Sequence, residues 1–370
     1  MSAGQKDLPR WLDVGVIPLI NLAIALVVAG LVVALVGQNP SQVMTALIKG
    51  ALGNQRGLSY TLYYATTFVF AGLAVAVAFH AGLFNIGGEG QAMIGGLGAG
   101  LVALSLAPSL PAWLMLPLMI VFAALFAGVW GAVPGYLQAY RGSHVVITTI
   151  MFNFLASSLM VYLLVNVLKP AGEMAPESAT FANSAKMPRV HSVLESVGIS
   201  WPSSPLNMSI VLAVIACVFV YLLLWKTRMG YQIRASGSSP GAAEYAGISP
   251  QRQVMLAMGI SGALAGMIAM NEVSGVHHKL LTDFVAGAGF TGIAVALMGR
   301  NHPMGIVLSA LLFGLISQGG AEVAFEVPGF TKDMVVMLQG LIVLFSGALA
   351  YVFAPLIARV YFALAKKEGA

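Results

Sequence analysis

Charged residues are scarce in this sequence of 370 residues, because Asp, Glu, Lys and Arg make up 8% of it and hydrophobic residues make up 59%. A soluble domain carries about 25% charged residues, since a surface that faces water needs them. A surface that faces lipid acyl chains excludes charge instead. The shortage therefore excludes a soluble domain of any size and indicates a chain that crosses the bilayer many times.

Cysteine is also nearly absent, since Cys217 is the single example. One cysteine excludes an intramolecular disulfide, and no Cys/His cluster with the spacing of a metal site accompanies it. The net charge of +5 is small and the basic residues are scattered, so nucleic acid is not an expected partner. The sequence also lacks the Gly-x-x-x-x-Gly-Lys-Ser/Thr phosphate loop, so we expect no nucleotide, metal or other cofactor on this chain.

What the sequence has instead is a series of long hydrophobic runs, most of them long enough to span a bilayer. We predict an all-α polytopic membrane protein, a single transmembrane domain over residues 1–370 with about ten transmembrane helices in contact with membrane lipid. The runs are Val14–Val36, Leu58–Phe79, Phe84–Leu106, Leu114–Leu137, His144–Leu168, Leu206–Trp225, Gln253–Val273, Gly287–Gly299, Pro303–Ser317 and Asp333–Phe353.

Lys and Arg are more frequent in the segments that ten spans place on the same side as the N-terminus. Because basic residues are enriched on the cytoplasmic side of membrane proteins, we expect both termini in the cytoplasm. Residues 169–205 then form a polar outer loop, and residues 226–252 form the longest inner loop. Glu272 is expected in an outer segment.

A weak internal similarity relates the third and eighth runs. Phe-x-x-Gly followed by a glycine-rich stretch starts at Phe84 for the third run and at Phe284, just before the eighth. If the chain consisted of two halves with five spans each, the second half would be inverted relative to the first. The sequence leaves open whether residues 14–168 and 206–353 are such inverted five-helix halves, with Glu89 near their pseudo-twofold axis.

The inner loop contains a short helix with clear signals at both ends. Ser239 is a good N-cap, Pro240 suits the first helical position, and Gly247 suits a left-handed cap at the C-terminal end. A helix of about two turns is too short to be stable alone. It is therefore either a docking element for a partner or a surface turn that joins two spans.

Three segments resemble ABC importer permeases of the branched-chain amino acid, ribose and nucleoside superfamily. Gly230–Ile248 is similar to the coupling-helix segment, which many of these permeases share. Gly82–Gly96, which reads GLFNIGGEGQAMIGG, and Gly289–Met304 resemble the nucleoside or simple-sugar permease branch. The resemblance extends over essentially the whole chain, and its most specific part is the segment Phe-Asn-Ile-Gly-x-Glu-Gly-Gln, Phe84–Gln91.

The resemblance implies a permease subunit, not itself an enzyme, that translocates a nucleoside or a simple sugar across the inner membrane of a bacterium. The implied partners are a second permease subunit, a cytoplasmic ATP-binding subunit that holds ATP and Mg, and an extracytoplasmic substrate-binding lipoprotein. The short inner-loop helix would lie in a groove of the ATP-binding subunit. The residues assigned to this coupling contact are Arg234, Ser239, Pro240, Gly241, Ala242, Ala243, Glu244, Tyr245, Ala246 and Gly247.

Glu89 is the most unusual polar residue, because a carboxylate at bilayer depth is costly. Asn85 and Glu89 are four residues apart and are predicted to share a helical face, with Gln91 pointing elsewhere. Two interpretations stay open for Glu89. It lines the translocation path, or it is a structural carboxylate that caps a broken helix or bonds a neighbouring span. The candidate path residues are Asn85, Glu89, Gln91, Gly289 and Thr291.

A second class of function stays open from the residues alone. A secondary carrier driven by protons or ions would use Glu89 as its relay. An intramembrane enzyme has no support, since the sequence contains no His-Glu-x-x-His. Nothing in these residues separates a purine nucleoside from a pentose, because both need hydrogen-bonding groups along a partly apolar passage.

Overall fold

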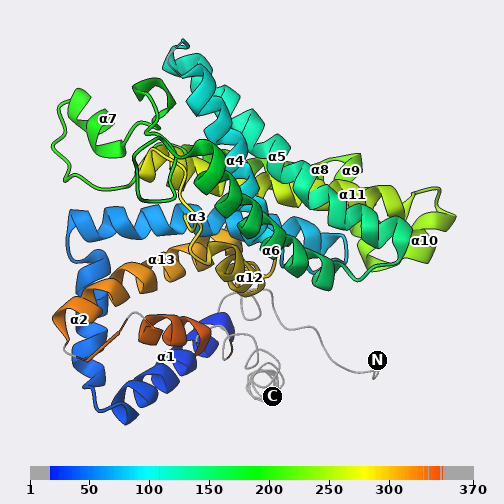
Figure 1. Cartoon of the computed structure of the whole chain (residues 1–370). Coiled ribbons are helices and arrows are strands. Elements are labelled where there is room, and N and C mark those ends of the chain that lie inside the picture. Colours follow the sequence, from blue (N-terminus) through cyan, green and yellow to red (C-terminus); the bar gives the residue numbers. More distant parts are fainter. Residues whose placement is uncertain (1–16, 108, 328, 332, 342–343, 345–370) are drawn as a thin grey trace, which may run out of the picture. The chain divides into compact units, whose positions relative to one another are not determined.

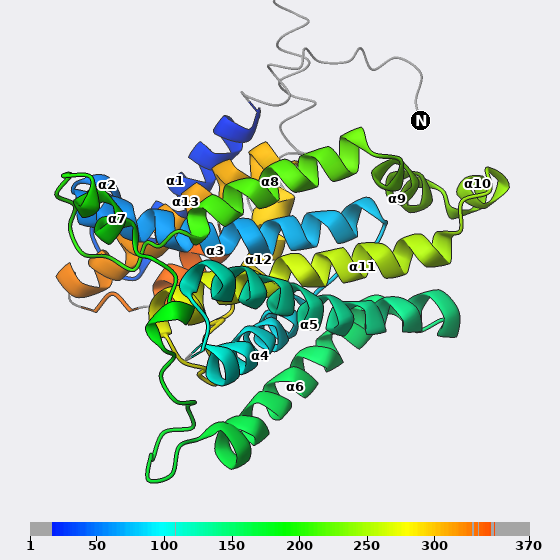
Figure 2. The same cartoon turned by 90° about the horizontal axis from the view of Figure 1, so that it is seen from above.

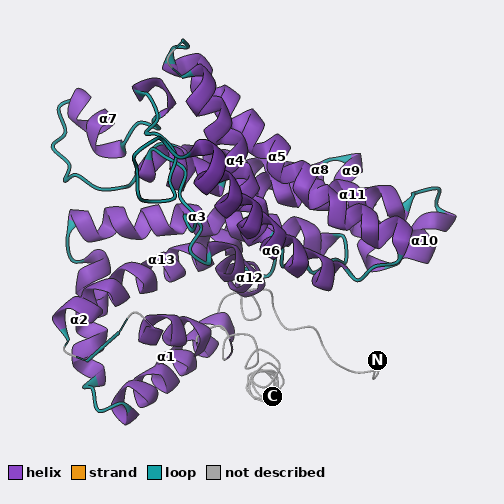
Figure 3. Ribbon diagram, viewed as in Figure 1, coloured by secondary structure: helices purple, strands orange, loops and turns teal. Residues whose placement is uncertain are grey.

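The computed structural model of the chain describes residues 17–107, 109–327, 329–331, 333–341 and 344 (Figure 1). Regular structure within these residues is helical (Figure 3), apart from one isolated β-bridge between Arg189 and Asn207. The elements are α1 (Ile17–Leu35), α2 (Pro40–Leu52), α3 (Gln55–His80), α4 (Gly88–Leu106), α5 (Ala112–Arg141), α6 (Val145–Leu163), the π-helical η2 (Leu164–Leu168), the 3-10 turn η3 (Asn183–Ala185), α7 (Val190–Ser196), α8 (Ser209–Lys226), α9 (Arg228–Ser238), α10 (Pro240–Tyr245), α11 (Pro250–Gly266), the π-helical η4 (Met270–His277), α12 (Ala288–Met298) and α13 (Pro303–Glu326).

Six helical segments of the described chain are long and apolar enough to cross a membrane, and they confirm the predicted all-helical, membrane-spanning class. They are Gln55–His80, Ala112–Arg141, Val145–Leu168, Ser209–Lys226, Pro250–His277 and Pro303–Glu326. Shorter apolar stretches occur in α1 and α12. The total of ten spans stays a prediction, because most of the tenth run lies outside the described residues.

The helices differ from the predicted runs at several boundaries and in one additional helix. The third run begins as a helix only at Gly88, because the chain first makes a turn at Gly82, whose φ is +74°. The ninth run continues beyond Ser317 to Glu326. Helix α2 is absent from the predicted runs, because polar residues such as Gln42 and Lys49 interrupt its apolar face.

The chain divides into two compact units, residues 1–51 with 316–370 and residues 52–315. In the first unit, α2 packs closely on the C-terminal part of α13. A side chain at Gly319 would collide with the backbone of Leu47, and Gln339 Nε2 donates a hydrogen bond of 2.9 Å to Ser317 Oγ. Small residues therefore permit this close approach between helices.

In the second unit, α3 is the central helix, with 83% of its most apolar stretch buried, whereas the corresponding value for α5 and for α6 is 22%. Helix α11 lies between α3 and α5, and α8 lies on the other side of α3 (Figure 2). The outer helices carry exposed apolar side chains, such as Phe154 at 65% and Val214 at 60%. Exposed apolar faces of this extent fit a surface that contacts lipid.

Helices α5 and α11 approach each other through glycine. A Cβ atom at Gly262 would lie 3.0 Å from the backbone carbon of Ala127 and 3.3 Å from Cα of Gly128. At Gly259, one turn away, the nearest atoms would be 3.7 Å and 3.8 Å distant, which is ordinary contact. The close approach of the two helices therefore occurs at Gly262 and not at Gly259, one turn earlier in α11.

We expect Gly262→Ala to lower the free energy of unfolding by about 1–3 kcal/mol, because the added methyl group forces two packed backbones apart. Thermal unfolding of the purified chain in detergent measures the effect. The matched control is Gly259→Ala, which adds the same methyl group to the same helix and should leave the unfolding temperature unchanged. Equal behaviour of the two variants would contradict the close packing described here.

Candidate functional site

The loop before α4 is held by its own polar side chains. Asn85 Nδ2 donates to Gln91 Oε1 at 3.0 Å and to Ser261 Oγ at 2.8 Å, and Asn85 Oδ1 accepts from the backbone N–H of Gly87 at 2.8 Å. Ser261 Oγ donates in turn to the carbonyl oxygen of Ala74 at 2.6 Å. The start of α4 is thus tied to α11 and α3 by a continuous buried chain of hydrogen bonds.

Glu89 points in a different direction, toward the first turn of α12. Its Oε1 accepts from the backbone N–H of Gly287 and its Oε2 from that of Gly289, both at 2.8 Å. The free N–H groups at the start of a helix favour an anion, so Glu89 supplies the N-terminal cap of α12 from another helix. Gly287 has a φ of +80°, a conformation that favours glycine, and it has no side chain to cap the helix itself.

These contacts correct the predicted geometry of the Glu89 cluster. Asn85 lies outside α4, so it does not share a helical face with Glu89, and it bonds Gln91 instead. The regular-helix assumption failed because the chain is still in a loop at Asn85. Glu89 and Gly289 do come together, as expected, whereas the hydroxyl of Thr291 bonds the carbonyl oxygen of Gly287 at 3.2 Å within its own helix.

Helix α6 fixes the same loop from a third side. Asn153 Nδ2 donates to the carbonyl oxygen of Ile86 at 3.0 Å, and Asn153 Oδ1 accepts from the backbone N–H of Gly90 at 2.9 Å. Glu89 is 6% exposed, Gln91 1% and Asn85 1%. All three are therefore hydrogen-bonded and shielded in this state, and any role in solute passage stays a prediction.

A second buried carboxylate, Glu272, lies in η4 and is 7% exposed. The hydroxyls of Tyr63 and Thr67 on α3 donate to its two oxygens, the latter at 2.6 Å, and Asn271 Nδ2 is 3.4 Å away. A buried carboxylate needs such donors, because an unpaired charge away from water is very costly. Assigning Glu272 merely to an outer segment therefore missed a buried site.

The network continues from Asn271 into α8. Asn207 Nδ2 and Ser209 Oγ donate to Asn271 Oδ1 at 3.0 Å and 2.6 Å, and Asn271 Nδ2 donates to Thr67 Oγ1 at 2.7 Å. Polar side chains from α3, the start of α8 and η4 thus form one connected cluster. The sequence feature that could have indicated this cluster is the adjacent pair Asn271 and Glu272 at the end of an apolar run.

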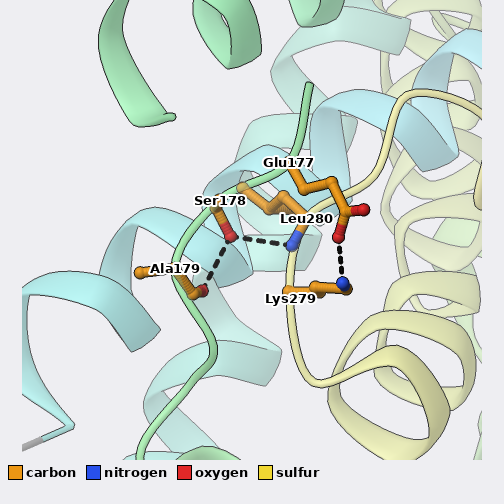
Figure 4. Close-up of polar contacts among 5 residues, drawn as sticks. All are labelled: Glu177, Ser178, Ala179, Lys279 and Leu280. Carbon is orange, nitrogen blue, oxygen red and sulfur yellow. Dashed lines mark hydrogen bonds and ion pairs between the residues drawn. The ribbon is translucent and has the colours of Figure 1, made fainter. Parts of the chain in front are cut away.

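The segment predicted to be the outer loop, residues 169–205, packs directly on the segment that follows η4 (Figure 4). The backbone N–H of Ser178 donates to the carbonyl oxygen of Leu280 at 3.1 Å, and the N–H of Leu280 returns a bond to Ser178 Oγ at 2.9 Å. Lys279 forms an ion pair with Glu177. Further along, the N–H of Met187 donates to the carbonyl oxygen of Ser274 at 3.1 Å.

This packing extends to the histidine beside it. Nδ1 of His278 lies 2.9 Å from the carbonyl oxygen of Ser274, and the carbonyl of His278 accepts from the N–H of Phe181 at 2.7 Å. Burial lowers the pKa of His278, so its ring is neutral near pH 7. The predicted polar outer loop is therefore anchored by hydrogen bonds rather than freely solvated.

The predicted end signals of the inner-loop helix are confirmed in α10. Ser239 Oγ accepts from the backbone N–H of Ala242 at 3.4 Å, Pro240 is the first helical residue, and Gly247 has a φ of +79°. Tyr245 is 97% exposed, and Glu244 is also exposed. A capped helix that presents a bare tyrosine and a carboxylate fits a docking element.

Two residues assigned to coupling behave differently from the others. Ala243 is 3% exposed and faces the protein, so it holds α10 in place instead of offering a surface. Arg234 Nε donates to the carbonyl oxygen of Leu224 at 3.0 Å, which ties α9 to the end of α8. The freely presented side chains are those of Glu244 and Tyr245.

A metal centre finds no support in the part of the chain that the structure describes. No group of three or more His, Cys, Asp or Glu side chains lies together there. In the adjacent pair His277 and His278, His278 is hydrogen-bonded to Ser274 and to Phe181.

Residues 57–347 match the family model described as branched-chain amino acid transport system / permease component. The chain is 34% identical over 357 residues to the guanosine ABC transporter permease protein NupP of Bacillus subtilis, covering 96% of this chain and 97% of that one. It is 33% identical over 344 residues to the glucose ABC transporter permease protein TsgB13 of Haloferax volcanii, with 92% and 89% covered. It is 32% identical over 326 residues to the nucleoside ABC transporter permease protein NupB of Lactococcus lactis, with 86% and 85% covered.

We expect Glu89→Gln to lower the free energy of unfolding by about 1–3 kcal/mol, because the amide nitrogen cannot accept the second N–H of α12. Thermal unfolding of the purified chain provides the measurement. Asp283→Asn is the control, since Asp283 is an exposed carboxylate shortly before α12. Native stability of Glu89→Gln together with lost uptake would favour a direct contact with solute over the capping role.

We expect Tyr63→Phe to cost a similar amount, about 1–3 kcal/mol, because it removes a donor from the buried carboxylate of Glu272. Tyr64→Phe removes the same hydroxyl group at the next position of α3, where Tyr64 makes no hydrogen bond with the residues that the structure describes. Chemical denaturation monitored by intrinsic fluorescence compares the two. A larger loss in the Tyr64 variant would refute the assigned role of the network.

Proposed function

Because this chain belongs to the branched-chain amino acid transport system permease family, in its nucleoside and simple-sugar branch, we propose that it is the membrane-spanning subunit of an ATP-driven importer. It translocates a nucleoside or a simple sugar across the plasma membrane of a bacterium, with both termini in the cytoplasm. The relatives are permease proteins rather than catalytic subunits, and ATP and Mg are held by a separate ATP-binding subunit.

The observation that carries the proposal is α10. A helix of six residues cannot be stable alone, yet this one has an N-cap, an N-terminal proline and a left-handed glycine at its end. It is anchored through buried Ala243 and presents Glu244 and exposed Tyr245 outward. A rigid, exposed aromatic residue is the kind of anchor that dominates protein interfaces.

Three partners complete the proposed importer. The ATP-binding subunit receives α10, a second permease subunit pairs with this chain in the membrane, and an extracytoplasmic lipoprotein delivers the solute. The relatives include two distinct guanosine permease proteins of Bacillus subtilis, NupP and NupQ, which supports a pair of unlike permeases.

The proposed architecture has ten spans in two inverted halves. Its support is the contact between the starts of α4 and α12, the two glycine-rich segments that the internal similarity relates. A Cβ atom at Gly88 would lie 3.4 Å from the carbonyl oxygen of Gly289, and Glu89 bonds the same turn. Discontinuous helices that meet in this way are typical of transporters with inverted repeats.

The candidate path residues are Asn85, Glu89, Gln91, Gly289 and Thr291. In the present state they bond one another or their own helices, so solute contact requires that the starts of α4 and α12 separate. A secondary carrier that uses Glu89 as a relay is less well supported, because protonation would weaken the two backbone bonds that the carboxylate accepts.

We expect Tyr245→Ala and Glu244→Arg to reduce recovery of the ATP-binding subunit about ten-fold or more when the tagged chain is purified in mild detergent, as for central anchors of an interface. Mass spectrometry of the purified complex measures the recovery. Glu195→Arg is the matched control, because it reverses an exposed charge on another short helix, α7.

Uptake of labelled nucleoside and labelled sugar into cells distinguishes an ATP-driven importer from a secondary carrier. An importer loses uptake on ATP depletion and in both α10 variants. Uptake that persists without ATP but collapses with an uncoupler would identify a secondary carrier instead. Competition between unlabelled nucleosides and sugars then identifies the solute class.

A further inference from the structure

The outer surface of α11 carries a groove of about 470 Å³, a volume within the range of small-ligand sites. It opens between α11 and α5 and is separate from both buried carboxylate clusters. Five of its lining residues are apolar or lack a side chain, and one is a cation. The lining residues are Ala132, Arg252, Met255, Leu256, Gly259 and Ile260.

The groove exists because small residues meet at this point. Gly259 has no side chain, and a Cβ atom there would lie 3.8 Å from the methyl group of Ala132 across the interface. Leu256, which is 42% exposed, forms one wall. Arg252, Leu256 and Gly259 are spaced four and three residues apart, so they lie on one face of α11 and form a continuous strip.

Exposed tyrosines mark the level of this strip in the membrane. Gly135 on α5 packs against Met255, since a Cβ atom there would lie 3.3 Å from Cα of Met255. In the next turns of α5, the rings of Tyr136 and Tyr140 lie 5.3 Å apart and are 40% and 52% exposed. Exposed tyrosines are enriched at the headgroup level, which places nearby Arg252 at the same level.

Arg252 supplies the charge that selects the occupant. It is exposed and makes no ion pair with any residue in the described ranges. Its guanidinium group can bind a phosphate through two parallel hydrogen bonds. From this guanidinium group at headgroup level, the apolar strip leads toward the membrane interior. This arrangement matches a phospholipid, which carries a phosphate at the end of its acyl chains.

We propose that this groove binds one anionic phospholipid, with its phosphate on Arg252 and an acyl chain along Leu256, Gly259 and Ala132. The site is independent of the proposed transport function, because it requires only that the chain spans a membrane. Basic pockets between transmembrane helices bind anionic lipid headgroups in this way.

Native mass spectrometry measures lipid binding to the purified chain and tests the proposal. The chain is titrated with phosphatidylglycerol or with phosphatidylcholine of the same acyl chains. Arg252→Gln should weaken phosphatidylglycerol binding about five-fold, the contribution of one basic residue near an anionic lipid. Gly259→Leu should displace either lipid by filling the groove. Arg228→Gln is the control, because it removes an exposed cation on α9 and should leave binding unchanged.

Ala132→Leu fills the groove from α5 and replaces Gly259→Leu if that variant does not fold. Phosphatidylglycerol binding that is equal in the native chain, Arg252→Gln and the groove-filling variant would overturn the proposal. Loss of a co-purified second permease from the groove-filling variant, with lipid binding unaltered, would also overturn it, since the groove would then be a protein interface.

Discussion

The structure depends on how backbone N–H groups are satisfied where a helix begins inside a membrane protein. Water is not available there, so each free N–H group needs a protein acceptor. Helix α12 begins at a glycine with no side chain, and Glu89 from α4 supplies both acceptors. The cost of burying the carboxylate is offset by these bonds, so the two discontinuous helices stabilise each other.

The same constraint explains the second polar cluster. After α11 the helix widens into the π-helical η4, whose side chains Asn271 and Glu272 bond α8 and α3. The other end of η4 offers the carbonyl oxygen of Ser274 to the outer loop. Buried polar groups in both regions connect elements that are distant in sequence, while the outward surface stays apolar.

Hydrophobic runs predicted most helices because the bilayer imposes length and polarity on each span separately. Local end signals likewise predicted α10, since Ser239, Pro240 and Gly247 act within their own turn. The polar clusters could not be predicted in this way. Glu89 meets α12 almost two hundred positions away, and the partners of Glu272 come from α3, so their pairing exists only in the packed fold.

The burial and hydrogen bonding of these side chains constrain how a solute can pass. Each oxygen of Glu89 accepts a backbone bond, and the amides of Asn85 and Gln91 bond each other. All three side chains are buried, so a solute hydroxyl reaches them only if the surrounding segments separate, and an unpaired N–H at the start of α12 then costs about 1–3 kcal/mol. Tight solute binding by these groups is therefore unfavourable in this state.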